Sequence, residues 1–269
     1  MTTATAITSH VKPIARAGLV AKGVVYCLLG ILAFMAAFHM GGQSTNSADK
    51  EGVLGVIYKQ TGGKLMLALI ALGLFCYSLW RGIQTFADTE RKGHDAKGLA
   101  ARARYLFSGL IYASLAAYAV KILFSQTSGS GKNSQQSMVQ DLLNKPFGEW
   151  LLGLAAAVII GVGVYQIYYG LSEKYRKHVS SVGNTSTRKM LLNAGKIGYV
   201  ARGIVWLIIG WLFAKAALHS NSSEAGDTSK AFKFLADASY GAYLLGAVGA
   251  GLICYGIFNF IRARYENFN

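Results

Sequence analysis

Six apolar stretches run through the chain and limit what it can fold into. They lie near residues 17–40, 65–87, 104–124, 147–171, 197–218 and 240–261. Each is long enough, at roughly 20 residues, for a helix to cross a hydrocarbon core, whereas the strands of a membrane barrel would be about 10 residues long and alternate in polarity. These stretches are rich in Gly, Ala, Leu, Ile and Tyr and do not alternate. The sequence therefore predicts an all-α integral membrane protein with six transmembrane helices.

One residue pattern occurs three times, each time at the start of an apolar stretch. Its copies read Arg16-x5-Lys22-Gly23-x2-Tyr26, Arg102-x5-Ser108-Gly109-x2-Tyr112 and Lys196-x5-Arg202-Gly203-x2-Trp206. The second copy follows the first by 86 residues and the third follows it by 180. The next stretch of each unit carries a signature of its own: Gly73-x3-Tyr77, Gly161-x3-Tyr165 and Gly251-x3-Tyr255. The chain thus divides into three two-helix repeats within one membrane domain, at residues 1–90, 91–175 and 190–264.

Two crossings per repeat mean that all three repeats enter the membrane from the same side. Parallel repeats are related by an axis along the membrane normal, so we expect a six-helix bundle with pseudo-threefold symmetry. Whether such a bundle encloses a cavity or packs shut is left open by the sequence. Short amphipathic segments follow the first helix of each repeat, at Asp49–Lys59, Ser134–Asn144 and Thr228–Asp237. These predict short helices that lie on the outer membrane surface or pack against the mouth of the bundle.

The net charge of +15 suggests a nucleic-acid ligand at first, but the distribution of the charges indicates membrane topology. With the N-terminus in the cytoplasm, 18 of the 27 Lys and Arg residues and 5 of the 12 acidic residues fall on the inner side. The inner side then carries +13 and the outer side +2, which is the positive-inside bias. We therefore expect both termini in the cytoplasm. No nucleic-acid partner is expected, because the usual motifs and a basic, aromatic groove are absent.

Three short motifs point to a known family. They are the opening Ala-Arg-x-Gly-x-x-x-Lys-Gly-x-x-Tyr from Ala15 to Tyr26, the Gly-Gly-Gln linker at 41–43, and the helix start Pro146-Phe147-Gly148. Together they resemble the bacterial membrane family known as domain of unknown function 1206, over nearly the whole chain. The second repeat departs from the pattern, with Arg104 in place of Gly and Ser108 in place of a basic residue. The resemblance implies six transmembrane helices in a bacterial inner membrane and implies no activity.

A basic collar is the sharpest candidate site. One repeat position holds Arg16, Arg102 and Lys196, and a second position, six residues on, holds Lys22, Ser108 and Arg202. A charge within a membrane helix costs about 2.5–3.5 kcal/mol on insertion scales. The plainer interpretation is that these side chains extend to the inner interface and set the topology. The functional interpretation is a cationic ring that binds an anionic headgroup or solute, with membrane lipids as partners.

Two histidines also share a repeat position, at the outer ends of the first and fifth membrane helices. These are His39 and His219, with Ser125 in the second repeat. Facing histidines could bind a metal or haem, but a metal site needs a third or fourth ligand and none is evident. A pair of interfacial histidines is the plainer interpretation, and no cofactor is predicted.

No catalytic motif is found, and no acidic residue lies deep in a span. The second absence argues against a proton-coupled transporter and a hydrolytic enzyme. Three hypotheses remain. The first is a non-enzymatic structural or accessory protein that binds lipid, a protein partner or a second copy of itself. The second is a small channel or transporter for an anionic solute or lipid along the pseudo-threefold axis. The third is a metal- or haem-binding redox protein that uses His39 and His219.

Overall fold

The protein folds into helices throughout the part of the chain that the structure describes. A computed structural model describes residues 2–40, 45, 48, 50–87, 93, 95–125, 132–179 and 185–266, and no strand occurs among them. Six helices are long and apolar enough to cross a membrane. They are α1 (Thr2–Ala37), α3 (Gly63–Phe86), α4 (Ala96–Ser125), α6 (Gly148–Leu171), α7 (Thr185–Leu218) and α9 (Gly241–Tyr265). The prediction of an all-α, multi-pass membrane protein is confirmed.

The long helices overlap the six apolar stretches and differ from them mainly at their starts. The helix α4 begins at Ala96 rather than near residue 104, and α7 begins at Thr185 rather than near residue 197. Both added segments carry basic residues, and the one in α4 is otherwise mostly alanine, which favours a helix without being strongly apolar. Hydropathy locates the apolar segment and not the end of the helix.

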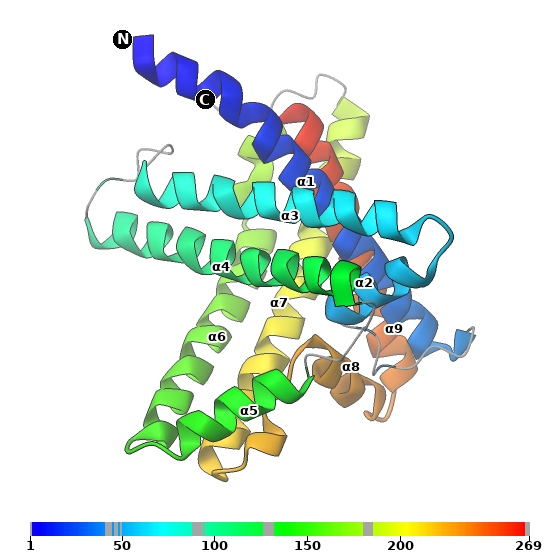
Figure 1. The fold of residues 1–269 in the computed structure, drawn as a ribbon. Helices are drawn as coiled ribbons and strands as arrows, with labels where there is room; N and C mark the ends of the chain where they lie inside the picture. The colour runs from blue at the N-terminus through cyan, green and yellow to red at the C-terminus, as the bar shows by residue number, and fades with distance from the viewer. Residues whose placement is uncertain are drawn as a thin grey trace.

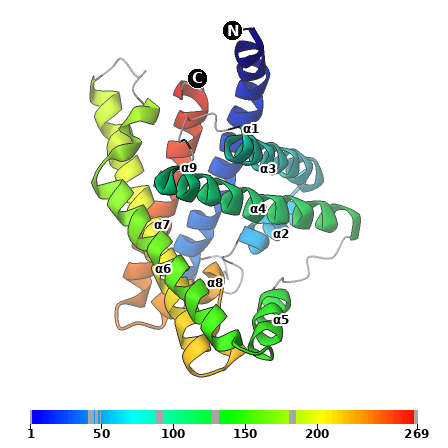
Figure 2. The same ribbon diagram turned by 90° about the vertical axis from the view of Figure 1, so that its left-hand side faces the viewer.

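The six long helices form an open row of three pairs (Figures 1 and 2). The first membrane helix of each repeat packs against the second membrane helix of another repeat, in the pairs α1–α9, α4–α3 and α7–α6. Contacts between α1 and α3 and between α7 and α9 join these pairs into the order α4–α3–α1–α9–α7–α6. Over their described residues, the end helices α4 and α6 are not packed against each other. Both views also show the α3–α4 pair running across the other two pairs. The pseudo-threefold bundle is therefore not confirmed.

The glycine shared by all three copies of the collar pattern lies where the repeats meet. A Cβ atom added to Gly23 would lie 2.7 Å from the ring of Phe260, and one added to Gly203 would lie 2.6 Å from the side chain of Ile167. At Gly109 the nearest atom would be 3.2 Å away. Lipid provides no hydrophobic drive between helices, so close backbone approach through small residues supplies the packing. All three repeats keep glycine at this position because the first membrane helix of each repeat packs closely here against a helix of another repeat.

Two of the three short helices pack into the bundle. The helix α2 (Lys50–Lys59) contacts α1, α3 and α4 and buries Val53 and Leu54 completely. The helix α8 (Thr228–Ala236) contacts α7 and α9 and buries Ala231 and Phe232 completely. The third, α5 (Lys132–Leu143), rests on α6 and on the short 3₁₀ helix η4 (Ser222–Glu224). Of the two predicted positions for these helices, packing against the bundle is therefore observed for α2 and α8.

Candidate anion-binding cavity

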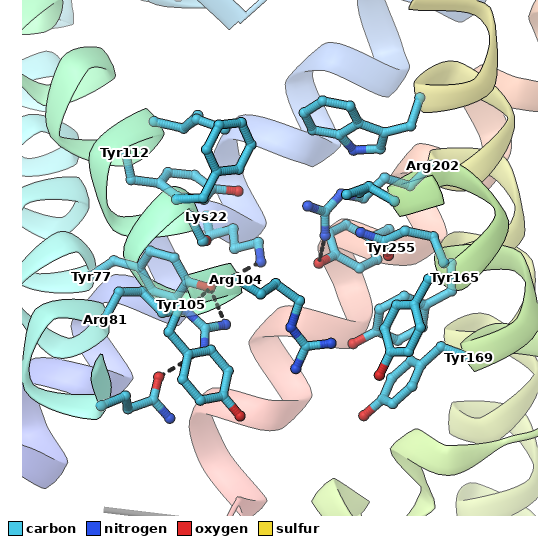
Figure 3. Close-up of a pocket in the computed structure, with 18 of the residues that line it drawn as sticks. Lys22, Tyr77, Arg81, Arg104, Tyr105, Tyr112, Tyr165, Tyr169, Arg202 and Tyr255 are labelled. Atoms are coloured by element: carbon cyan, nitrogen blue, oxygen red, sulfur yellow. Dashed lines mark hydrogen bonds between the residues drawn. The ribbon is translucent and has the colours of Figure 1, made fainter. Parts of the chain in front are cut away.

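A cavity of about 1020 Å³ lies between α4 and α6 and is backed by α1, α3, α7 and α9 (Figure 3). Its polar lining is dominated by basic side chains, namely Lys22, Lys50, Arg81, Arg104, Lys174, Arg202 and Arg262, against one carboxylate, Glu266. Aromatic side chains make up much of the remaining wall: Tyr77, Trp80, Tyr105, Tyr112, Tyr165, Tyr169, Tyr199, Trp206 and Tyr255. Such a lining is cationic and rich in hydrogen-bond donors.

Lys22 is held at the back of the cavity by tyrosines from three neighbouring helices. It lies on α1 and is only 3% exposed. Its Nζ donates a hydrogen bond to the hydroxyl of Tyr77 at 3.2 Å. The same ammonium lies 5.0 Å from the ring centroid of Tyr77, 5.5 Å from that of Tyr112 and 5.3 Å from that of Tyr255. Cation–π attraction and one neutral acceptor replace part of the hydration that Lys22 loses on burial.

Arg202 is placed in the same way by the third repeat. Its Nη1 donates to the hydroxyl of Tyr255 at 2.5 Å, and its guanidinium lies 5.0 Å from the Tyr255 ring and 5.4 Å from the Tyr26 ring. The Nε atom of Arg202 is buried and has no hydrogen-bond partner among the described residues. Buried donors are normally paired. Arg202 therefore keeps a buried N–H that can still bind an acceptor.

Arg81 completes the cationic wall on the α3 side. Its Nε and Nη2 donate to the hydroxyl of Tyr77 at 2.9 and 2.6 Å, and its Nη1 donates to Oε1 of Gln84 at 2.7 Å. The Tyr77 hydroxyl thus accepts hydrogen bonds from both Arg81 and Lys22. Figure 3 shows the head groups of Lys22, Arg81, Arg104 and Arg202 turned toward a common space.

Most of this positive charge has no protein counter-charge. Arg262 is neutralised by Glu266, which accepts its Nε and Nη2 hydrogen bonds at 2.7 and 3.0 Å. Within the described part of the chain, no carboxylate pairs with five of the other six: Lys22, Lys50, Arg81, Arg104 and Arg202. Among these five, Lys22 is buried, and buried charges are usually paired. The cavity therefore has the charge, the donors and the room to hold an anion.

The six residues of the predicted anion site separate into two sets. The inner collar position lines the cavity with Lys22, Ser108 and Arg202. The outer collar position, made up of Arg16, Arg102 and Lys196, does not. Arg102 instead donates from Nε to the carbonyl oxygen of Thr85 at 2.7 Å, and Arg16 is exposed. Anion binding by any of the six stays a prediction.

Several lining residues were missed by reasoning from sequence. The second-helix tyrosines were noticed as a repeated signature, but not as partners of the collar. The signal was present, because Lys22 and Tyr77 recur together as Arg202 and Tyr255. Lys50 had no such signal. It reaches the cavity because α2 packs into the bundle, where its Nζ lies 5.6 Å from each of the rings of Tyr26 and Tyr112.

The two histidines lie away from the cavity. His39 and His219 are both exposed, and His219 Nδ1 lies 2.9 Å from a carboxylate oxygen of Glu224. This hydrogen bond holds the pKa of the Glu224 carboxyl below its ordinary value. The described residues contain no group of three His, Cys, Asp or Glu side chains that could hold a metal ion. The metal and haem hypothesis gains no further ligand from the fold.

Together, the fold and the repeats define a multi-pass helical membrane protein built from one unit used three times. The chain belongs to the family described as Domain of Unknown Function (DUF1206), whose profile matches residues 17–88, 103–173 and 197–266. The resemblance seen in the sequence motifs is thereby confirmed. Among its relatives is "Uncharacterized protein YxxB" of Bacillus subtilis (strain 168), 31% identical over 258 residues, which are 96% of this chain and 92% of the relative. No solved structure matches the chain.

Proposed function

We propose that this protein is a non-enzymatic membrane protein that binds the anionic headgroup of a lipid in the cavity. The observation that carries the proposal is the set of five basic side chains that line one cavity and have no carboxylate partner in the described part of the chain. A phosphate group offers several acceptor oxygens to such a set and supplies the missing negative charge.

The arrangement of the donors supports a headgroup rather than a bare counter-ion. Lys22 and Arg202 approach from α1 and α7, and Arg81 approaches from α3. Donors that surround a space from several sides are suited to an acceptor that is larger than a single atom. The tyrosine hydroxyls orient Lys22 and Arg202 in advance, so less side-chain entropy is lost when a ligand binds.

The proposal predicts that lipid retention depends on the inner collar and not on the outer one. We expect the double variant Lys22→Met/Arg202→Met, purified in a neutral detergent, to keep at least about tenfold less anionic phospholipid than wild type, because a hydrogen bond to a charged group contributes about 1.5–3 kcal/mol. Mass spectrometry of co-purified lipid measures the effect. The matched control is Arg16→Met/Lys196→Met, which removes two basic residues outside the cavity. Equal retention in wild type and the inner variant would refute the proposal, as would equal loss in both variants.

We also propose that the protein lies in the bacterial inner membrane with both termini in the cytoplasm. The excess of Lys and Arg on one side of the spans supports this orientation. Both termini lie at the end of the molecule opposite α5 and α8 (Figure 2). Reporter fusions at each terminus are expected to be active only for a cytoplasmic reporter. Activity of a periplasmic reporter at either end would contradict the orientation.

A further inference from the structure

We infer that the ligand's headgroup enters the cavity sideways from the membrane, between α4 and α6, and that Arg104 and Phe107 of the second repeat hold this entrance open. The inference rests on the proposed function and adds the route and the source of the ligand, a lipid of the bilayer. It follows from comparing the same repeat positions in all three copies.

The first of these positions is a glycine in two repeats and an arginine in the third. A Cβ atom on Gly18 would lie 2.5 Å from Tyr77 Cβ, and one on Gly198 would lie 2.6 Å from Tyr255 Cα. These glycines let α1 approach α3, and α7 approach α9, to backbone contact. The equivalent residue of the second repeat is Arg104, 86 residues after Gly18. A long side chain therefore stands where the other repeats require none.

The second position lies one helical turn further on and shows the same change. A Cβ atom on Gly73 would lie 2.5 Å from Ala21 Cβ, and one on Gly251 would meet Ala201 Cβ. In the second repeat the alanine is replaced by Phe107. Its partner glycine is Gly161, where an added Cβ would have no atom within 4 Å. Two bulky residues in one repeat thus match α4 and α6, which do not pack against each other over their described residues.

Arg104 bridges the entrance without closing it. Its guanidinium lies 5.3 Å from the ring of Tyr105 on α4 and 5.1 Å from the ring of Tyr165 on α6. Figure 3 shows it between these two tyrosines, in front of Lys22 and Arg202. At the inner collar position the second repeat carries Ser108, whose short side chain lines the cavity. The repeat that opens the entrance is therefore also the one that lacks a long basic side chain at this position.

The rim of the entrance indicates a lipid rather than a water-soluble anion. Phe107 is 50% exposed and Val158 is 56% exposed, and both line the cavity. They belong to two helices that are long and apolar enough to cross a membrane, in the spans Gly98–Phe124 and Gly148–Leu171. An apolar rim in front of a cationic interior matches an amphiphile whose headgroup lies inside and whose chains remain in the bilayer. A soluble anion has no part that would use such a rim.

The entrance can be blocked without removing a cationic residue. We expect Gly161→Trp to lower the retention of anionic phospholipid at least about tenfold, because its side chain extends from α6 into the cavity mouth, where there is open space. The matched control is Gly153→Trp, on the same helix, where an added Cβ also meets nothing within 4 Å but which does not line the cavity. Its retention should equal that of wild type.

A second variant tests whether a bulky side chain on α4 holds α4 and α6 apart. In Phe107→Ala, which keeps every cation of the cavity, the second repeat receives the alanine of the other two, so α4 should approach α6 and retention should fall as in Gly161→Trp. The inference is overturned if both entrance variants retain phospholipid like wild type while Lys22→Met/Arg202→Met loses it, and in that case the proposed function stands. If none of the variants loses phospholipid, the proposed function itself is overturned. The delipidated protein is also tested for binding of inorganic phosphate. If it binds phosphate while the purified protein retains no phospholipid, the cavity is a site for a soluble anion and the inference is overturned.

Discussion

Alanine at Gly73 is expected to destabilise the protein by about 1–3 kcal/mol, the usual range for overpacking a tight core. The added methyl group would lie 2.5 Å from Ala21 Cβ, which is attached directly to a helix backbone and cannot rotate away. To make room, α1 and α3 must separate, and this loosens the contact that holds Tyr77 next to Lys22. Because two helices must move, the effect should be large for so small a substitution.

The same substitution at Gly161 should be neutral or slightly stabilising. Gly161 occupies the equivalent repeat position on α6, where an added Cβ meets nothing within 4 Å, and alanine is intrinsically favoured over glycine in a helix by about 1 kcal/mol. Thermal unfolding of the three variants Gly73→Ala, Gly161→Ala and Gly251→Ala in detergent measures the difference. The first and third should melt below wild type. A loss of stability at Gly161 as large as at Gly73 would show that α6 packs closely after all.

Replacing Lys22 and Arg202 with methionine should change stability in opposite directions in two environments. In a neutral detergent without anionic lipid, Lys22 is buried and Arg202 is partly buried, and no carboxylate of the described residues lies beside either cation. Exchange of buried charged groups for apolar ones of similar volume is often neutral, or stabilising by about 1–4 kcal/mol. The double variant should then unfold at the same temperature as wild type or above it, despite the loss of its hydrogen bonds to Tyr77 and Tyr255.

Added anionic phospholipid should reverse that order. A ligand that binds only the folded state stabilises it by about 2.7 kcal/mol at a concentration 100 times its Kd, and this gain should appear in wild type alone. Melting curves with and without the lipid, and with a zwitterionic lipid of the same chains, make the comparison. If the double variant is less stable than wild type by the same amount in every condition, the two residues serve only packing and the cavity is not a lipid site.

The sequence predicted the helices well because each one depends on its own residues. Apolar length alone located six spans, and the repeated pattern that contains Gly23, Gly109 and Gly203 located the start of each repeat. The inner collar position was also singled out as a candidate site, and Lys22 and Arg202 line one cavity, while anion binding there stays a prediction. Properties that belong to one helix, or to one position in every copy, can be found by comparing a chain with itself.

The open interface could not be predicted in this way, because it depends on the pairing of residues from two helices. Arg104 was visible as a departure from the pattern, but its meaning requires knowing that Gly18 and Gly198 contact the backbones of Tyr77 and Tyr255. The repeats suggested a pseudo-threefold bundle, and the missing contact between α4 and α6 over their described residues leaves that arrangement unconfirmed. Lys50 gave no signal in the sequence, because it reaches the cavity only through the packing of α2 against α1, α3 and α4.

The unequal interfaces also explain what is gained by joining three repeats in one chain. A symmetric trimer of separate two-helix subunits would have three identical interfaces, so a residue such as Arg104 would occur in all of them and separate every neighbouring pair of helices. Covalent linkage lets one copy differ while the other two keep the molecule together. A single lateral entrance is therefore available to a fused chain and not to a symmetric trimer, and the two tightly packed repeats provide the frame against which it stays open.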